Sequence, residues 1–321
     1  MTLEDFPMIF HFILNPKSGR SPQQKKMEGE IVEACLKRQL SYRIYYTTKP
    51  RDSINYIQNI LREYPDERHR FICAGGDGTI NEIANSAPGN DMVEFGVIPS
   101  GSGNDFVRNF TNRKAFQDIN AQIDGEAHSY DLIKCNDDYC VNMVNIGFDC
   151  SVVIEANKFR KFKFISPGIS YMLGVVVGFF FRKLRTRMKI IFDDGKIIDE
   201  DLVLTAIGNG KFCGGGFQCC PLASLKDGLL DICIIKKVTR PTFLQLVGSY
   251  KAGTFLVKKN AQKFFRYIRT NHFRMEFENE QSVCIDGELT SARSVDFTVI
   301  PGGFNFVLPK GVEISYPGVE K

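Results

Sequence analysis

The stretch Ala74-Gly75-Gly76-Asp77-Gly78-Thr79-Ile80-Asn81-Glu82 decides the fold class of this chain. It follows the strand-like run 70–74 directly and leads into a helix predicted over 79–86. Its three glycines let backbone N–H groups approach a phosphate closely, and a helix N-terminus adds positive potential there. Asp77 would repel a bare phosphate, so the loop predicts a Mg²⁺ ion between the two. Considered alone, the loop could instead be a strand-to-helix turn with a capping aspartate.

Two further loops of similar character follow neighbouring predicted strands. Asn15-Pro16-Lys17-Ser18-Gly19 follows the apolar run 8–14, and Pro99-Ser100-Gly101-Ser102-Gly103-Asn104-Asp105-Phe106 follows the run 94–98. Open α/β sheets bind ligands at the carboxyl edge of their strands, so we expect the three loops to meet there. Asp105 would add a second carboxylate to Asp77.

The first 135 residues alternate between predicted strands and predicted helices, which indicates a parallel sheet covered by helices. The expected strands are 8–14, 42–47, 70–74 and 94–98, and the expected helices are 22–39, 50–64 and 79–86.

After about residue 131, short strand-like runs separated by Gly and Asp turns predict mostly antiparallel β structure. The expected strands are 140–146, 187–192, 201–207, 229–235, 282–285 and 295–300, with helical inserts near 166–183 and 240–252.

Length and composition agree with two globular domains. The chain has 321 residues, of which 43% are apolar and 24% charged, and this balance excludes a disordered or fibrous protein. Its net charge of +4 is too small to imply nucleic-acid binding. The ten cysteines form no C-x-x-C pair and predict no disulfide framework. An acidic start, MTLEDFPMIF, does not resemble a signal peptide, so we expect a cytoplasmic protein.

One segment has the apolar character of a membrane span. Residues 164–181 carry no charge over 18 residues, close to the lower limit for crossing a bilayer. Gly174 and Gly178 are spaced for close helix packing, which suits a water-soluble protein equally well. We therefore expect a buried or interfacial helix, with a true span as the alternative.

The motifs together resemble the diacylglycerol kinase catalytic-domain family, in particular the soluble bacterial lipid kinases related to sphingosine and ceramide kinases. The resemblance rests on NPKSG at 15–19, GGDGTINE at 75–82, GSGNDF at 101–106, NIGFD at 145–149 and a late Asp286-Gly287-Glu288. NAD kinases and phosphofructokinases share only the G-G-D-G portion.

The resemblance implies ATP- and Mg²⁺-dependent phosphorylation of the hydroxyl of diacylglycerol or a related lipid, giving phosphatidic acid or an analogue. It implies Glu288 as the general base, with Asp77 and Asp105 serving phosphate, Mg²⁺ or the acceptor hydroxyl. The alternative for Glu288 is a solvated hairpin carboxylate. The implied ATP contacts are Asn15, Pro16, Lys17, Ser18, Gly19, Thr48, Gly75, Gly76, Asp77, Gly78, Thr79, Ile80, Asn81 and Ser102.

The resemblance also implies a structural Mg²⁺ site in the segment 224–229. There the Asp227 carboxylate would join the backbone carbonyls of Ser224 and Leu229. A turn aspartate before glycine is the alternative for Asp227.

The implied fold has two domains with ATP bound between them, against Glu288. A Rossmann-like α/β nucleotide domain, like that of phosphofructokinases and NAD kinases, would hold residues 1–130 and 304–321. A β-sandwich lipid-substrate domain would hold residues 131–303.

Positive charge is concentrated in two blocks. Residues 158–189 contain nine Lys or Arg and no acid, and residues 251–274 contain seven and none. Both blocks include aromatic residues, as in 158–164 and 263–267, a combination typical of peripheral binding to anionic membranes. A plain solvated face and RNA binding are the alternatives. We expect a lipid substrate at an anionic membrane surface and no nucleic-acid partner, and the sequence permits a homodimer.

Two other function classes stay open. A kinase for a soluble hydroxylated metabolite, similar to NAD kinase, would not need the basic-aromatic blocks. A catalytically silent nucleotide or lipid sensor would not need Asp77, Asp105 and Glu288 together.

Overall fold

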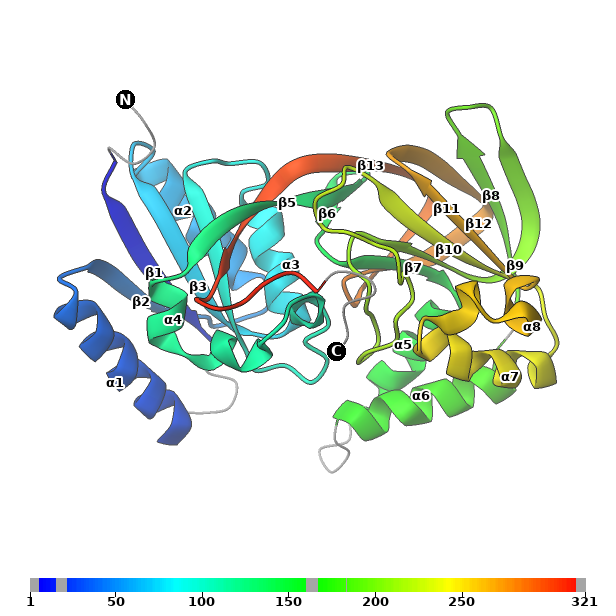
Figure 1. The fold of residues 1–321 in the computed structure, drawn as a ribbon, viewed down its shortest axis with the longest axis horizontal. Coiled ribbons are helices and arrows are strands. Elements are labelled where there is room, and N and C mark those ends of the chain that lie inside the picture. The colour runs from blue at the N-terminus through cyan, green and yellow to red at the C-terminus, as the bar shows by residue number, and fades with distance from the viewer. Residues whose placement is uncertain (1–5, 16–21, 160–166, 183, 316–321) are drawn as a thin grey trace. The chain divides into compact units, whose positions relative to one another are not determined.

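The computed structural model describes residues 6–15, 22–159, 167–182 and 184–315, which divide between two compact units (Figure 1). Unit 1 holds Met1–Tyr130 and Gly302–Tyr316, and unit 2 holds Asp131–Pro301 and Pro317–Lys321. Two strands, β5 (Glu126–Cys135) and β13 (Glu288–Leu308), contain the boundaries between the units.

Unit 1 is built on a parallel sheet in the order β2-β1-β3-β4-β13. The predicted strand-helix alternation and parallel sheet are confirmed. The strands are β1 (Met8–Leu14), β2 (Ser41–Tyr46), β3 (Arg68–Gly75) and β4 (Val93–Pro99). The helices are α1 (Pro22–Lys37), α2 (Asp52–Glu63), α3 (Asp77–Ser86) and α4 (Ile119–Ile123), with 3₁₀ turns η3 (Phe106–Asn109) and η4 (Arg113–Gln117).

Helices cover both faces of this sheet. Alternate residues of each strand point to opposite faces, so each strand contributes side chains to both helix layers. On β1, Phe10, Phe12 and Leu14 share a buried core with residues of α1 and α4. His11, between them, lies 3.0 Å from the Tyr56 hydroxyl of α2. With both faces covered, the strand ends are where loops can form a site.

A buried polar network lies on the α2 side of the sheet. Nε2 of His11 lies 3.1 Å from Nδ1 of His69, and Nε2 of His69 lies 3.1 Å from the Tyr64 carbonyl oxygen. Burial, followed by the charges of His69 and Arg43, lowers the pKa of His11 to about 3. His11 is therefore neutral wherever the fold is intact near neutral pH.

Unit 2 is an antiparallel sheet in the order β11-β10-β9-β7-β12-β13, with β8 paired to β9 and β12, and β5 paired to β6 and β13. The antiparallel prediction is confirmed. The remaining strands are β6 (Asp138–Cys140), β7 (Met143–Gly147), β8 (Thr186–Phe192), β9 (Ile197–Gly208), β10 (Leu230–Lys236), β11 (Phe265–Thr270) and β12 (His272–Ile285).

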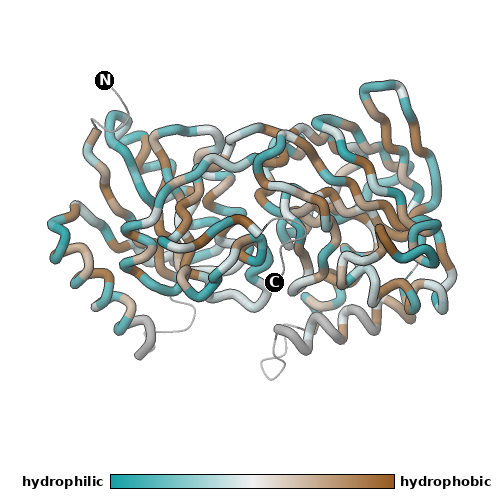
Figure 2. Tube along the Cα trace, viewed as in Figure 1, coloured by the Kyte–Doolittle hydropathy of each residue, from teal (hydrophilic) through white to brown (hydrophobic). Residues whose placement is uncertain are grey.

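The strands of unit 2 separate two hydrophobic cores. On β10, Leu230, Ile232 and Ile234 enter one core among the strands, while Cys233 and Ile235 enter a second core beneath helices. Figure 2 shows the hydrophobic residues concentrated along the strands of both units. The helical elements of unit 2 are α5 (Phe148–Phe159), α6 (Pro167–Phe181), α7 (Arg240–Lys251), η5 (Thr254–Leu256) and α8 (Lys259–Gln262).

The apolar helix α6 packs against α5 through its glycines. A Cβ atom at Gly174 would lie 2.6 Å from the Val152 carbonyl oxygen and 2.8 Å from the Ala156 nitrogen, so only glycine allows this approach. Among the described residues, no helix is long and apolar enough to cross a membrane. The helix-packing interpretation of the Gly174–Gly178 pair is thereby supported.

Some predicted boundaries were wrong. The helix expected from residue 50 begins at Asp52, because Arg51 has a φ of 62°. The strand expected over 140–146 is divided between β6 and β7. The strand expected over 295–300 is part of a longer strand, β13, which continues through Pro301 with Gly302 at a φ of 64°.

Candidate active site

Four strand ends of unit 1 meet in register at one edge of the sheet. Leu14 of β1 pairs with Tyr46 of β2 and with Ala74 of β3, and Gly75 pairs with Pro99 of β4. Asn15, Thr48, the loop 75–79 and the loop 100–105 all follow these ends, so this edge brings the described ATP-contact candidates of unit 1 together. Residues 16–19, also expected to contact ATP, lie outside the described residues.

Asp77 joins two of these loops directly. Its Oδ1 accepts hydrogen bonds from the backbone N–H groups of Asp105 at 2.7 Å and Phe106 at 3.3 Å. The N-cap residue of α3 is Gly76, and Asp77 is the first residue of the helix. The Asp77 side chain therefore supports the neighbouring loop from the N-terminus of α3.

The glycines of these loops are required by close packing. A Cβ atom at Gly76 would lie 2.9 Å from the Cα of Gly101, and one at Gly101 would lie 2.6 Å from the Cα of Gly76. The Ser100 N–H also donates to the Gly75 carbonyl oxygen at 2.8 Å. The two backbones therefore touch, and any side chain at either glycine would separate them.

Two carboxylates line one spot beside Gly103. A Cβ atom at Gly103 would lie 2.8 Å from Oδ2 of Asp77 and 3.3 Å from Oδ2 of Asp105. The two oxygens are therefore within about 6 Å of each other. Asp105 is buried, with 7% of its surface exposed, whereas the glycine loops around it are partly exposed. Paired carboxylate oxygens of this kind are the ligands that Mg²⁺ prefers.

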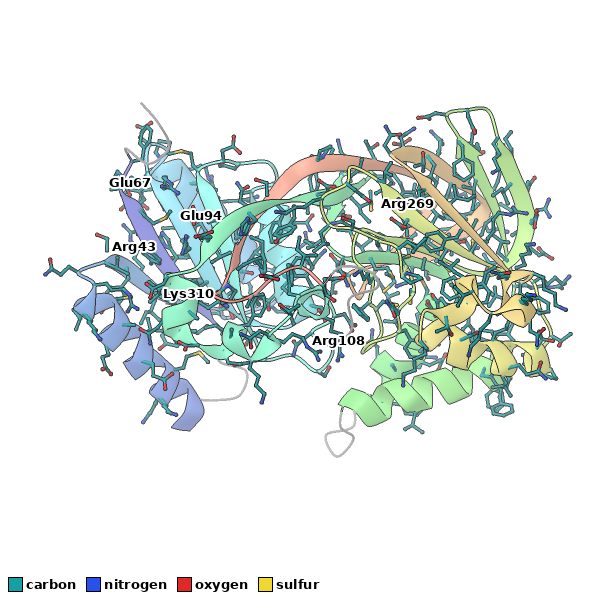
Figure 3. All side chains as sticks on the ribbon, viewed as in Figure 1. Arg43, Glu67, Glu94, Arg108, Arg269 and Lys310 are labelled. Atoms are coloured by element: carbon teal, nitrogen blue, oxygen red, sulfur yellow. The ribbon has the colours of Figure 1, made fainter. Side chains whose placement is uncertain are left out.

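Arg108 and Asn104 shape the same loop, and neither role was predicted from the sequence. The Arg108 guanidinium (labelled in Figure 3) donates to the Gly103 carbonyl oxygen through Nε at 3.2 Å and Nη2 at 3.1 Å. Its Nε also lies 3.2 Å from Oδ1 of Asp105. Asn104 has a φ of 48° and exchanges two hydrogen bonds with Gly101. The spacing of Asp105 and Arg108, three residues apart, was a usable signal for this ion pair.

Thr48 is held by a carboxylate at the start of α2. Its N–H and its hydroxyl donate to Oδ2 of Asp52 at 2.7 and 2.9 Å. These bonds, led by that from the Thr48 backbone, lower the pKa of Asp52. Because the hydroxyl proton is engaged, Thr48 can offer a nucleotide only the acceptor side of its oxygen.

The rest of the glycine loop contributes to packing as well. The side chain of Ile80 is buried, so only its backbone could face a ligand. Glu82 accepts from the Arg51 N–H at 2.8 Å and from the Ser53 hydroxyl, which ties α3 to the start of α2. Ser102 is exposed on the third loop.

In unit 2, Glu288 follows a two-residue hairpin turn between β12 and β13. Asp286 and Gly287 have φ values of 47° and 94°, the left-handed pair of a type I′ turn. The Asp286 carboxylate accepts from the N–H groups of residues 141, 142 and 143 at 2.8–3.0 Å, and from the Cys140 thiol at 3.1 Å. The turn that carries the exposed Glu288 is therefore anchored at Asp286, a role that was not predicted from the sequence.

At the predicted structural metal site, the guanidinium of Arg269 pairs with Asp227. Asp227 accepts from the Leu229 N–H at 3.2 Å and forms an ion pair with Arg269, which is labelled in Figure 3. Nε of Arg269 also lies 3.4 Å from the buried Asp231 carboxylate. Asp227 thus has the geometry of a turn aspartate, and its Mg²⁺ site with Ser224 and Leu229 stays a prediction.

Family models match almost the whole chain. The model of the diacylglycerol kinase catalytic domain matches residues 10–135, and that of the YegS C-terminal NAD kinase beta sandwich-like domain matches residues 142–308. The chain belongs to the diacylglycerol kinase catalytic-domain family. The resemblance in its motifs is thereby confirmed, as are the α/β domain and the second, β-sandwich-like domain.

Named relatives match most of the length of this chain. A protein of Pseudomonas aeruginosa named "probable lipid kinase YegS-like" is 31% identical over 243 residues, 75% of this chain and 77% of that protein. The diacylglycerol kinase of Bacillus subtilis is 26% identical over 303 residues, 93% of this chain and 95% of that protein. A crystal structure of a diacylglycerol kinase from Bacillus anthracis shares the fold, with a TM-score of 0.68 at 20% identity over 94% of this chain and 97% of that one.

Membership establishes the reaction class. The chain is a phosphotransferase with an alcohol acceptor, and a kinase of this family implies ATP as the phosphoryl donor.

Proposed function

We propose that this kinase transfers the γ-phosphate of ATP, with Mg²⁺, to the hydroxyl of diacylglycerol or a closely related lipid. The observation that carries the proposal is the pair of carboxylates, Asp77 and Asp105, that line one spot beside Gly103. They stand among glycine loops whose backbones are exposed enough to approach phosphate groups.

In this proposal the residues of unit 1 bind and orient the nucleotide. The loop 75–79 directs the N-terminus of α3 at the phosphates, which favours their negative charge. Oδ2 of Asp77 and Oδ2 of Asp105 would hold Mg²⁺, and the ion would neutralise charge on the transferring phosphoryl group. Oδ1 of Asp77 accepts the N–H groups of Asp105 and Phe106, so Asp77 would both bind the ion and position the loop 100–105.

Glu288 is the proposed general base. A lipid hydroxyl is a poor nucleophile at neutral pH, and a carboxylate that accepts its proton assists attack on the γ-phosphorus. The anchored Asp286-Gly287 turn holds the backbone of Glu288 while leaving its side chain exposed.

A second Mg²⁺ at Asp227 is proposed as structural. The ion would bind the Asp227 carboxylate and the carbonyls of Ser224 and Leu229, and it would have to displace Arg269 from Asp227. Asp231 stays within reach of that guanidinium, so Arg269 would keep an anionic partner.

The acceptor is tested by offering several alcohols in one assay. Radiolabelled ATP is incubated with the kinase and with diacylglycerol, ceramide or sphingosine in mixed micelles, beside NAD and glycerol in solution. We expect label in the diacylglycerol product or that of a related lipid. Label in NAD alone would replace the proposal with a metabolite kinase, and no transfer to any acceptor would support a silent sensor.

We also propose that the protein binds peripherally to an anionic bilayer. The aromatic residues of the basic block 251–274 do not support this proposal. Phe265 is buried, and Phe264 and Tyr267 pack against the core beneath the helices. Residues 160–164 of the other block lie outside the described residues.

The surface that supports membrane binding lies on α6 and α7. Phe180 and Phe181 at the end of α6 are 61% and 81% exposed, and Leu244 on α7 is 59% exposed. The two helices are joined there, because Nε of Arg240 donates to the Phe179 carbonyl oxygen at 2.8 Å. Large apolar side chains that stay this exposed mark a site where a membrane or a partner can bind.

The charge around this surface is positive. Arg185 and Lys237 are more than half exposed and share one ion-pair partner, Asp201, so these three residues together keep one net positive charge. The sequence contains no acid between Asp231 and Glu276. Cationic side chains attract anionic headgroups while aromatic rings insert at the interface. An anionic bilayer is therefore the partner that fits this surface.

Vesicle sedimentation tests the surface with matched controls. We expect the Phe180→Ser/Phe181→Ser variant to bind vesicles of phosphatidylcholine and phosphatidylglycerol less than wild type does. Leu36→Ser on α1 and Ile197→Ser on β9 remove side chains that are 65% and 56% exposed, and should bind normally. Wild-type binding should also weaken at high salt. Equal binding by all variants, or equal binding to neutral vesicles, would refute the surface.

A further inference from the structure

A pair of thiols in unit 2 is placed for covalent bonding. Sγ of Cys213 lies 2.7 Å from Sγ of Cys219, about 0.7 Å more than a disulfide bond requires. Both residues are present as thiols. We infer that Cys213 and Cys219 form a redox-active dithiol, a modification site that a peroxide oxidises to a disulfide.

The segment between the two thiols is built to let them meet. Gly214, Gly215 and Gly216 all have positive φ values, of 58°, 81° and 106°. The N–H groups of Cys213 and Phe217 each donate to the other's carbonyl oxygen, at 2.9 and 2.8 Å, and close the turn. Glycines of this kind allow a small backbone shift without side-chain strain.

Solvent exposure determines which of the two thiols reacts first with an oxidant. All ten cysteines lie among the described residues, and Cys213 alone is not buried. Burial raises the pKa of the Cys219 thiol to about 11, which keeps that sulfur protonated and unreactive toward an oxidant in solution. Cys213 is therefore the thiol that a water-borne oxidant reaches first, and Cys219 is the resolving thiol.

The neighbouring Cys220 is directed elsewhere. Its Sγ lies 3.3 Å from the Asp231 carbonyl oxygen, and its N–H donates to the Lys211 carbonyl oxygen. The adjacent pair Cys219-Cys220 therefore does not compete, and the disulfide is expected between Cys213 and Cys219.

The chemistry balances with hydrogen peroxide as the oxidant. The Cys213 thiolate attacks one peroxide oxygen and becomes a sulfenic acid as hydroxide leaves and is protonated to water. The Cys219 sulfur then attacks the sulfenic sulfur, the S–S bond forms, and a second water leaves with the thiol proton. Two thiols lose two electrons in all, and a dithiol reductant such as dithiothreitol returns them.

The dithiol connects to the turn that carries Glu288. The carbonyl oxygen of Phe212, next to Cys213, accepts from the Asn142 side chain at 2.7 Å. The Asn142 N–H in turn donates to Oδ1 of Asp286 at 3.0 Å. Drawing Cys213 toward Cys219 strains this chain of hydrogen bonds, so oxidation should lower turnover. This consequence rests on the proposed role of Glu288, whereas the thiol chemistry does not.

Mass spectrometry of the full-length protein tests the disulfide independently of activity. The protein is treated with hydrogen peroxide, alkylated and digested with trypsin. Cleavage after Lys211 and Lys226 releases Cys213, Cys219 and Cys220 in one peptide. We expect this peptide to lose two hydrogens and to carry one alkyl group, at Cys220, and dithiothreitol to restore three alkylated cysteines.

Variants decide which sulfurs are joined. Cys213→Ser and Cys219→Ala should each abolish the two-hydrogen loss, whereas Cys220→Ala should retain it. Three alkylated cysteines after peroxide treatment of wild type, or persistence of the disulfide in Cys213→Ser, would overturn the assignment. Turnover that peroxide leaves unchanged while the disulfide forms would overturn the coupling to Glu288. If the untreated protein phosphorylates no lipid, the proposed function fails and the thiol result still stands.

Discussion

A methyl group at Gly103 would enter the spot lined by the two carboxylates. Gly103 is not among the residues with positive φ, so alanine fits the backbone without strain. The new Cβ would nevertheless lie 2.8 Å from Oδ2 of Asp77, where ordinary contact begins at 3.4 Å. Asp77 cannot rotate away freely, because its Oδ1 holds the N–H groups of Asp105 and Phe106. The carboxylate must therefore shift by about 0.6 Å.

Misplacing a positioning group by a distance of this order lowers turnover by roughly 10- to 100-fold. We expect that fall in kcat for Gly103→Ala, with a higher Mg²⁺ concentration needed for half-maximal rate. The assay measures label transfer from ATP to lipid across a Mg²⁺ series, beside the melting temperature. Gly29→Ala is the matched control, because a Cβ atom there meets nothing within 4 Å. Turnover of Gly103→Ala equal to that of Gly29→Ala at every Mg²⁺ concentration would refute the carboxylate pair as the metal site.

Three further outcomes follow from the described contacts. Asp286→Asn places an amide N–H group against backbone N–H donors, so the free energy of unfolding in urea should fall by about 2–4 kcal/mol, and an unchanged midpoint would contradict the anchoring role. Mg²⁺ should raise the melting temperature of wild type more than that of Asp227→Ala, which keeps only the proposed site at Asp77 and Asp105, whereas an equal response of both proteins would leave Asp227 as a turn residue. The pKa of His11 is about 3 in the fold and about 6.5 in the unfolded chain, so below pH 6.5 only the unfolded chain gains the proton. The free energy of unfolding should therefore fall by about 1.4 kcal/mol for each unit by which the pH is lowered from 6.5 to 3. Urea titrations at pH 7 and pH 5 should show a smaller decrease in this free energy for His11→Gln than for wild type. An equal decrease in both proteins would contradict a lowered pKa of His11.

Much of unit 1 could be predicted because local patterns and tertiary structure agree there. Strands β1, β3 and β4 are largely buried and contain apolar runs, and each ends at a loop of glycine or polar residues. That regularity placed Asp77 and Asp105 at one edge. The hydrogen bond between Oδ1 of Asp77 and the Asp105 backbone could not be predicted, because it depends on the register that sets Gly75 beside Pro99.

Unit 2 was less predictable because packing overrides local preference there. The segment of α5 with Val152, Val153 and Ile154, whose branched side chains favour strands, is helical and packs closely on Gly174 of α6. Pro301 and Gly302 indicate a strand end, yet β13 continues through them. Likewise, Arg269 reaches Asp227 from a strand 42 residues away, a contact without any local signal.

The Glu288→Gln variant shows whether carboxylates of this chain direct phosphate from ATP to a lipid hydroxyl. The substitution keeps the size of the side chain and removes the proton acceptor. Label transfer from ATP to diacylglycerol is measured for wild type and variant, together with ATP binding to each. We predict a fall in kcat of roughly 10²–10⁴-fold with ATP affinity unchanged. Wild-type turnover in Glu288→Gln would remove Glu288 as the base, and loss of ATP binding would make Glu288 a structural residue.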